Sequence, residues 1–175
     1  MSRFAIVQMR FSDEGELISL ELYNSEPNDS FPSSIFEIKS LQKLHVRGTQ
    51  CCDPDGSCKN FLFLPEKINQ LENLEELYWN NYSARLPESI IQMGGLKRLS
   101  LGLNRFSNSN SALIFQIPNL ETLYLNNCLY DSTVLSIENI AQLKSLKEIH
   151  IAGNQLSEDY IQTLRKEFPF IEIID

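Results

Sequence analysis

Three cysteines lie close together in the segment QCCDPDGSCKNF and have the most obvious reactive chemistry in this sequence. Cys52 and Cys58 could close a small loop by forming a disulfide, although a reducing compartment favours free thiols. Zinc would need a fourth ligand, which no nearby residue supplies to Cys51, Cys52 and Cys58. Calcium binding through Asp53 and Asp55 lacks the bidentate glutamate at the twelfth position of a calcium loop. The segment predicts a thiol- or metal-responsive switch only as the weakest functional hypothesis.

Classical catalytic chemistry has few candidates, because the chain contains only two histidines, His45 and His150. No glycine-rich phosphate loop of either common type occurs. Adjacent carboxylates such as Glu75 and Glu76 are available, but surface acids usually serve solubility. We therefore expect a non-catalytic protein with no cofactor and no bound metal.

A recurring leucine pattern defines the elements that must position these side chains. Residues 96–106, LKRLSLGLNRF, have leucines at the first, fourth and sixth positions and Asn104 at the ninth. Successive starts of this pattern are 22 to 33 residues apart, and all but one interval lie within the 20–29 residues typical of such repeats. The six starts are Leu17, Leu41, Leu74, Leu96, Leu120 and Leu146, and a seventh begins at Ile171 with Ile174.

A short strand with this spacing directs its leucines to one side, where a single turn of chain cannot shield them. Stacking the turns about 4.8 Å apart joins the leucines into one core and pairs the strands in parallel. After the strands, turns such as Leu64-Pro65 and Leu86-Pro87 lead into apolar residues at three-residue steps, which favour short 3₁₀ segments. His45 and His150 would then lie four coils, or roughly 19 Å, apart and could not share a metal or a proton.

The ninth position of the pattern should hold side chains that satisfy buried loop carbonyls. Asn104 and Asn154 occupy it in two coils, and Cys128 is a small substitute that we expect to be a structural thiol. Tyr82 fits poorly, so we expect a bulge or a register shift of one residue that brings Asn81 into this role. Trp79 falls on a core leucine position and is predicted to be buried.

The two ends of the chain differ from the repeats. Residues 4–11 and 16–23 are predicted to form a β-hairpin that covers the edge of the first coil. Asp131 or Ser132 is predicted to cap one helix and Ser157 another, which Pro169 would end. We expect one domain, 1–175, with a capping hairpin strand (1–16), repeats (17–156) and a C-terminal cap (157–175).

These features resemble those of leucine-rich repeat proteins across residues 17–175. The L-P-x-x-I elements at Leu64 and Leu86 are similar to those of bacterial and plant intracellular repeat proteins. The resemblance implies an α/β solenoid of six to seven coils, with a curved parallel sheet on the concave side and short 3₁₀ or α segments on the convex side. It also implies a non-enzymatic scaffold that binds other proteins on the concave sheet, without specifying the partner.

Residues between the core leucines should form rows across the concave face. Their central row contains Glu21, His45, Tyr78, Ser100, Tyr124 and His150. Tyrosine and arginine are frequent interface anchors, although sheets favour aromatic residues even without a ligand. The residues predicted to contact a partner are Tyr23, Lys43, His45, Arg47, Tyr78, Arg98, Tyr124 and His150.

Charge and composition limit the partner. The net charge of −8 and the pI near 4.8 argue against nucleic acid and anionic membranes, which are bound through clustered basic residues. No apolar run is long enough for a membrane span or a secretion signal, so a cytoplasmic protein is expected. A monomer is expected rather than an oligomer. The predicted partner is a protein or peptide with charges of both signs. The alternative is a structural or regulatory subunit that assembles through a sheet edge or the convex face.

Overall fold

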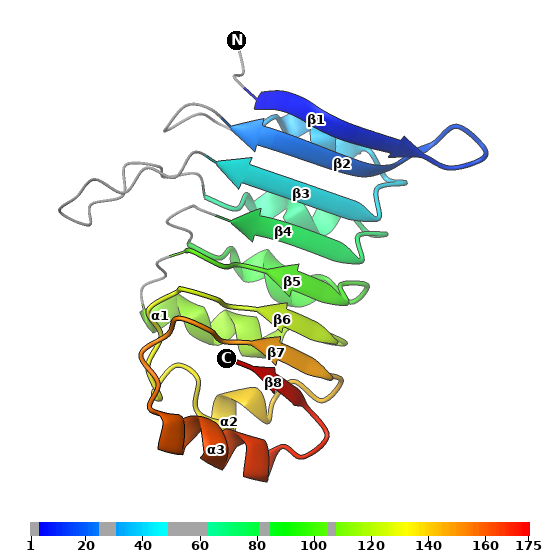
Figure 1. The fold of residues 1–175 in the computed structure, drawn as a ribbon. Helices are drawn as coiled ribbons and strands as arrows, with labels where there is room; N and C mark the ends of the chain where they lie inside the picture. Colours follow the sequence, from blue (N-terminus) through cyan, green and yellow to red (C-terminus); the bar gives the residue numbers. More distant parts are fainter. Residues whose placement is uncertain (1–3, 25–30, 49–62, 81–84, 105–107) are drawn as a thin grey trace, which may run out of the picture.

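The computed structural model describes residues 4–24, 31–48, 63–80, 85–104 and 108–175 (Figure 1). The cysteine cluster of Cys51, Cys52 and Cys58, including the predicted disulfide, lies outside these ranges. The bulge predicted at Tyr82 also lies outside them, but the preceding strand is unshifted, because Asn80 still pairs with Arg47.

One eight-stranded sheet runs through the molecule with its strands in chain order. The strands are β1 (Phe4–Phe11), β2 (Leu17–Asn24), β3 (Lys43–Gly48), β4 (Glu76–Asn80), β5 (Arg98–Ser100), β6 (Thr122–Tyr124), β7 (Glu148–His150) and β8 (Glu172–Ile174). Strands β2 to β8 are parallel, and β1 pairs antiparallel with β2 as the predicted hairpin. The predicted parallel solenoid is therefore confirmed.

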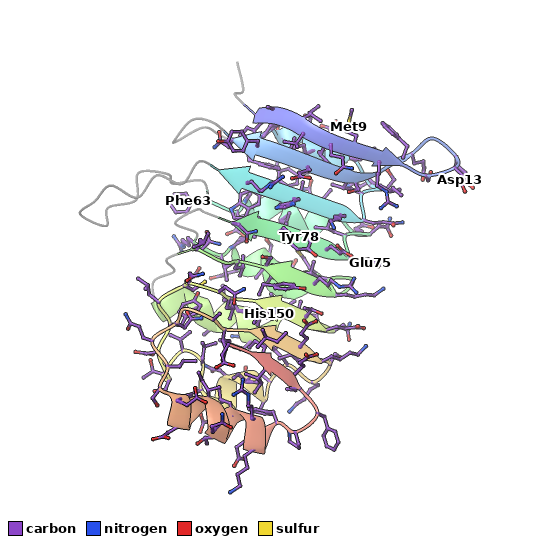
Figure 2. All side chains as sticks on the ribbon, in the orientation of Figure 1. Met9, Asp13, Phe63, Glu75, Tyr78 and His150 are labelled. Carbon is purple, nitrogen blue, oxygen red and sulfur yellow. The ribbon has the colours of Figure 1, made fainter. Side chains whose placement is uncertain are left out.

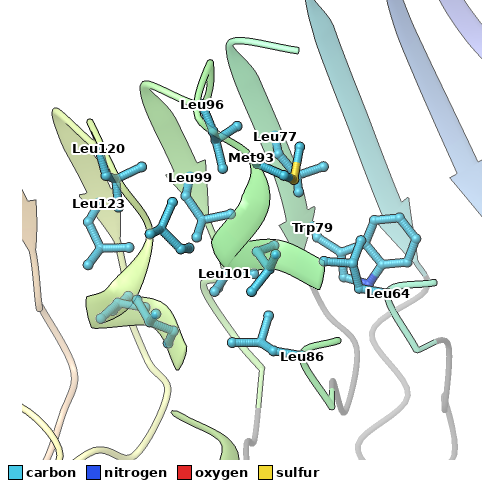
Figure 3. Packing of buried hydrophobic residues seen from close by; sticks show 14 of the residues in the cluster. Leu64, Leu77, Trp79, Leu86, Met93, Leu96, Leu99, Leu101, Leu120 and Leu123 are labelled. Atoms are coloured by element: carbon cyan, nitrogen blue, oxygen red, sulfur yellow. The ribbon is translucent and has the colours of Figure 1, made fainter. Parts of the chain in front are cut away.

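The fourth-position apolar residues align across the sheet and form the spine of the core (Figure 3). They are Leu20, Leu44, Leu77, Leu99, Leu123 and Ile149, each at most 4% exposed. The seventh coil differs from the prediction by one residue, because Ile149 pairs with Ile173 rather than with Ile174. Three isoleucines within four residues gave the pattern no means of choosing the register, and the structure buries Ile173 while Phe170 lies in solvent.

Short 3₁₀ helices lie behind the sheet and cover its apolar face (Figure 1). Three of them follow a proline at the N-cap, where the fixed φ and missing N–H suit the start of a helical turn. The segments are η1 (Ser33–Glu37), η2 (Glu66–Gln70), η3 (Glu88–Gln92) and η4 (Ala112–Gln116), with α1 (Asn108–Ser111) just before η4. Each 3₁₀ helix buries an isoleucine at its third position, as the three-residue apolar steps predicted.

Two helices form the C-terminal part of the fold. Helix α3 (Glu158–Glu167) is capped by Ser157, whose Oγ accepts a hydrogen bond from the Tyr160 amide, as predicted. The predicted cap at Asp131 or Ser132 is wrong: α2 (Ile137–Ile140) begins after Ser136, whose side chain is the cap. Asp131 instead accepts the Thr133 amide at 2.9 Å within its own turn. None of the helices in the described part is long and apolar enough to cross a membrane, and a cytoplasmic location stays a prediction.

The ninth-position side chains bond to buried carbonyls as predicted. The Asn104 amide donates to the carbonyls of Trp79 in the preceding coil, at 2.6 Å, and Leu101 in its own coil, at 2.7 Å. Asn154 repeats this arrangement one coil beyond Cys128, whose Sγ contacts the Leu101 carbonyl at 3.3 Å. These hydrogen bonds link the loops that follow the strands in neighbouring coils.

Trp79 fills the end of the core near the N-terminal coils. Its side chain is fully buried, as its core position predicted, and its ring packs 5.2 Å from the ring of Phe31. The core is therefore filled directly behind strand β4, whose outward residues contribute to the candidate site described next.

Candidate functional site

The sheet surface opposite the 3₁₀ helices, here called the open face, contains the side chains between the core leucines. Figure 2 shows Tyr78 and His150 on this face, projecting from β4 and β7. The pairing register places the predicted central row side by side: Glu21, His45, Tyr78, Ser100, Tyr124 and His150. Along β3 and β4, side chains that are partly or fully exposed on this face alternate with side chains buried in the core, as period-two patterning requires.

Four rings in this row, from His45, Tyr78, Tyr124 and His150, form what we call the aromatic ladder. The ring centroids of His45 and Tyr78 are 5.2 Å apart, and those of Tyr78 and Tyr124 are 6.3 Å apart. Tyr124 and His150 are stacked at 4.2 Å with an interplanar angle of 27°. These separations are typical of favourable aromatic pairs, so the rings support one another along the sheet.

A serine in the middle of the row allows the ladder to be continuous. Tyr78 and Tyr124 lie two strands apart, a backbone separation of roughly 9.6 Å, yet their rings come within 6.3 Å because both lean over Ser100. Ser100 is only 7% exposed, and its hydroxyl donates to the Asn80 side chain at 2.9 Å. A larger residue at this position would separate the tyrosines.

Tyr78 is held by charged neighbours on one side of the ladder. Lys43 Nζ lies 4.9 Å from the centre of its ring, and its hydroxyl donates to Glu76 Oε2 at 3.3 Å. Burial, reinforced by the Glu76 charge, raises the pKa of Tyr78 to about 12. The tyrosine is therefore neutral at any physiological pH and presents an apolar ring with one polar end.

Glu76 connects two basic residues along the same flank. Its carboxylate accepts from Lys43 at 3.0 Å and from Arg98 at 2.9 Å. Burial alone would raise the pKa of this carboxyl, but the hydrogen bond and charge of Lys43, together with Arg98, lower it overall. The two cations are thus fixed in position by one ionised acid.

His45 begins the ladder beside a second ion pair. Its Nδ1 lies 3.7 Å from Glu21 Oε1, and the same carboxylate pairs with Arg47. Burial lowers the pKa of His45, and the charges of Arg47 and Lys43 lower it further against the attraction of Glu21. The lowered pKa favours the neutral ring, whose Nε2 is buried and has no hydrogen-bond partner within the described residues.

His150 ends the ladder on β7. Its Nε2 lies 2.6 Å from Glu148 Oε1, and its ring stacks on Tyr124. Burial raises the pKa of Tyr124, with Glu148 adding to the effect. The carboxylate therefore orients the terminal ring of the ladder.

The other flank of the ladder is mostly uncharged. It carries Tyr23, Arg47, Asn80, Gly102, Asn126 and Ala152. The Asn126 side chain accepts from the Ala152 amide at 3.0 Å, so its own amide hydrogens point away from that bond. This flank offers neutral hydrogen-bonding groups next to the rings.

The structure brings together seven of the eight predicted contact residues. Direct contacts link Lys43, His45, Tyr78, Tyr124 and His150, while Arg98 joins through Glu76 and Arg47 through Glu21. Tyr23 lies next to Arg47 in the register, is 36% exposed, and has no recorded contact with the ladder.

Three acids that complete the site were missing from the predicted set: Glu21, Glu76 and Glu148. A signal for Glu76 was present, because Lys43, Glu76 and Arg98 occupy equivalent positions of three consecutive coils. Within the described residues, no cluster of histidine, cysteine and acidic side chains could hold a metal ion.

Stacked leucine coils, 3₁₀ segments behind a parallel sheet and asparagine bonds between coils define a leucine-rich repeat solenoid, and the chain resembles leucine-rich repeat proteins in fold. A leucine-rich repeat protein of Leptospira interrogans superimposes with a TM-score of 0.62, at 27% identity over 91% of this chain and 37% of its own. The plant peptide hormone receptor RGFR1, in complex with RGF2, gives a TM-score of 0.58 at 17% identity over 95% of this chain and 28% of its own.

A similarity in sequence alone is found with TMV resistance protein N of Nicotiana glutinosa. It is 29% identical over 150 residues, which cover 82% of this chain but 12% of that protein. The chain thus spans well under half of each of these proteins. No family model matches the sequence. Leucine-rich repeats generally serve as protein-interaction modules.

Proposed function

We propose that this chain is a non-catalytic module that binds a protein or peptide on its open face. The observation that carries the proposal is the aromatic ladder: four adjoining, half-buried rings on the open face, of which Tyr78 and His150 have a polar atom bonded to Glu76 and Glu148. Tyrosine rings held in this way bind at a low cost in conformational entropy.

The ladder and its flanks have separate roles in this proposal. Exposed ion pairs such as Lys43–Glu76 and Arg98–Glu76 each contribute at most about 1 kcal/mol, so they act mainly on orientation and association rate. Buried aromatic anchors contribute about 2 kcal/mol or more each when they are hot spots. The affinity should therefore depend mainly on Tyr78 and Tyr124. The position of the bound partner along the sheet should depend on the charged side chains.

The partner that fits this face carries apolar or aromatic groups next to charges of both signs. A bare polyanion does not fit, because Glu21, Glu76 and Glu148 alternate with the cations. The RGFR1 structure is a complex with RGF2, which supports binding of a protein or peptide by this type of fold. At 17% identity that likeness concerns the fold alone.

The test is a comparison of two double variants in affinity capture with quantitative mass spectrometry. Tyr78→Ala with Tyr124→Ala removes the centre of the ladder. Phe63→Ala with Phe170→Ala is the matched control, because it removes two rings that are 53% and 94% exposed away from the open face. We expect the ladder variant to lose the captured partner and the control to keep it.

With a purified partner, the loss of binding affinity can be measured. Loss of about 2 kcal/mol per anchor predicts binding roughly 30-fold weaker for each tyrosine removed, and about 1,000-fold weaker for the double variant if the losses add, as measured by calorimetry. Thermal unfolding of both variants shows whether the fold is kept. Equal capture by the ladder variant and the unmodified chain would overturn the proposed site.

A further inference from the structure

Strand β1 leaves one edge of the sheet open. It pairs with β2 on one side, and in the described part of the chain no strand pairs with its other side (Figure 1). Half of its backbone N–H and C=O groups therefore face away from the sheet. Large apolar side chains along it are exposed, at 59% for Ile6, 52% for Val7, 46% for Met9 and 55% for Phe11.

Two of these side chains are paired with buried core residues but are themselves exposed. Ile6 pairs with Leu22 and Met9 with Leu20, and both leucines are at most 4% exposed. The 3₁₀ helix η1 lies behind this end of the sheet (Figure 1), yet Ile6 and Met9 (labelled in Figure 2) remain exposed on β1. The core surface thus continues onto β1 and remains exposed there.

The opposite edge of the sheet is blocked by a side chain. In β8, the Glu172 amide and the Ile174 carbonyl bond to the β7 side, so the Ile173 carbonyl points outward. Arg165 of α3 donates to that carbonyl at 3.2 Å and also pairs with Asp175. By contrast, β1 contains one charge, Arg10, and no proline, so its protection as an edge strand is limited to the irregularities in its pairing between Ile6 and Gln8 and between Arg10 and Phe11.

We propose that two copies of this chain pair through β1 to form an antiparallel, two-fold dimer with one continuous sheet. Identical strands are self-complementary in this arrangement, and a two-fold contact closes on itself. Because Arg165 blocks the β8 edge, the chain offers one pairing edge, which gives a dimer instead of a filament.

Charge selects the antiparallel direction. The turn after β1 carries Asp13, Glu14 and Glu16 (Asp13 is labelled in Figure 2). Parallel pairing would bring the acidic turns of both copies together. Antiparallel pairing separates them by about the length of the strand, roughly 24 Å, which is more than twice the Debye length at physiological salt.

This proposal departs from the monomer expected from the sequence. The sequence also predicted that the hairpin covers the open edge of the first coil. The structure shows that β1 covers β2 but presents an exposed apolar edge of its own. The open edge has therefore moved outward by one strand.

Sedimentation equilibrium of the full chain, from about 1 to 100 µM, tests the dimer over the range of micromolar dissociation constants. We expect the mass to rise with concentration from 20.1 kDa toward twice that value. The variant Ile6→Lys with Met9→Lys should remain a monomer throughout, because lysines on an edge strand oppose pairing. Both side chains are about half exposed in the single chain, so the monomer should still fold.

The control is Leu129→Lys with Phe170→Lys, which changes the charge equally at apolar side chains that are 47% and 94% exposed elsewhere. We expect this control to dimerise like the unmodified chain. A monomer at every concentration would overturn the proposal, and so would a dimer that survives Ile6→Lys with Met9→Lys. Arg165→Ala should open the second edge and give species larger than the dimer.

Discussion

Replacement of Asn104 by alanine tests the bonds that join the coils. Asn104 is fully buried and donates to the Trp79 and Leu101 carbonyls. The Trp79 carbonyl would lose its asparagine donor, at a cost of about 1–3 kcal/mol. Leu101 keeps the Asn104 backbone amide and the Cys128 thiol, so it loses only about 1 kcal/mol. We expect Asn104→Ala to lower the free energy of unfolding by about 2–4 kcal/mol.

Urea unfolding followed by circular dichroism measures this change, and a constant m-value shows that the variants unfold in the same way. Asn73→Ala is the control, because the exposed Asn73 donates to the Lys39 carbonyl at 2.9 Å in contact with water; its loss should cost about 0.5 kcal/mol or less. Asn104→Cys should recover part of the loss, as Cys128 does one coil later. Equal costs for Asn104→Ala and Asn73→Ala would refute the reasoning.

Two further predictions concern titrating groups. Burial lowers the pKa of His45 in the folded chain, so the unfolded chain binds more protons and the free energy of unfolding should fall as the pH drops below 6.5. His45→Gln should reduce this pH dependence, as measured by urea unfolding at several pH values. An unchanged pH dependence would contradict the prediction. Burial raises the pKa of Cys128 to about 12, so in a chain with Cys51, Cys52 and Cys58 replaced by serine, a thiol reagent at pH 8 should react only after unfolding. Rapid labelling of the folded chain would contradict the second prediction.

The leucine spacing was sufficient to predict the strands, because each strand must bury the same positions against the next. Prediction failed where two neighbouring residues of similar type could each have filled the same structural position. Asp131 and Ser136 are both good cap residues, and only the fold shows that Asp131 bonds within its own turn while Ser136 starts the helix. Ile171, Ile173 and Ile174 were equally ambiguous, since each could serve as the buried residue of β8.

The position of the candidate site could be predicted from the sequence, but the contacts between its side chains could not. Period-two alternation placed Tyr78 and Tyr124 on the open face, but their approach over Ser100 depends on side-chain rotamers that no sequence pattern specifies. The role of Glu76 was missed although Lys43, Glu76 and Arg98 occupy equivalent positions of three consecutive coils, because a row of charges does not specify which side chains pair. Sequence periodicity therefore predicts rows, and packing decides which members of a row touch.

The proposed binding face and the proposed dimer edge are physically separable. A two-fold axis that pairs β1 antiparallel with its copy is perpendicular to the sheet, so both open faces point the same way and neither is covered. The aromatic ladder begins on β3, and strands β1 and β2 separate it from the axis. The symmetry-related ladder of the second copy is equally free. Such a dimer gains avidity for a partner that presents two binding segments, without any new contact at Tyr78 or Tyr124. Ile6→Lys with Met9→Lys should then weaken the capture of a bivalent partner while leaving its single-site affinity unchanged, whereas loss of Tyr78 and Tyr124 weakens both.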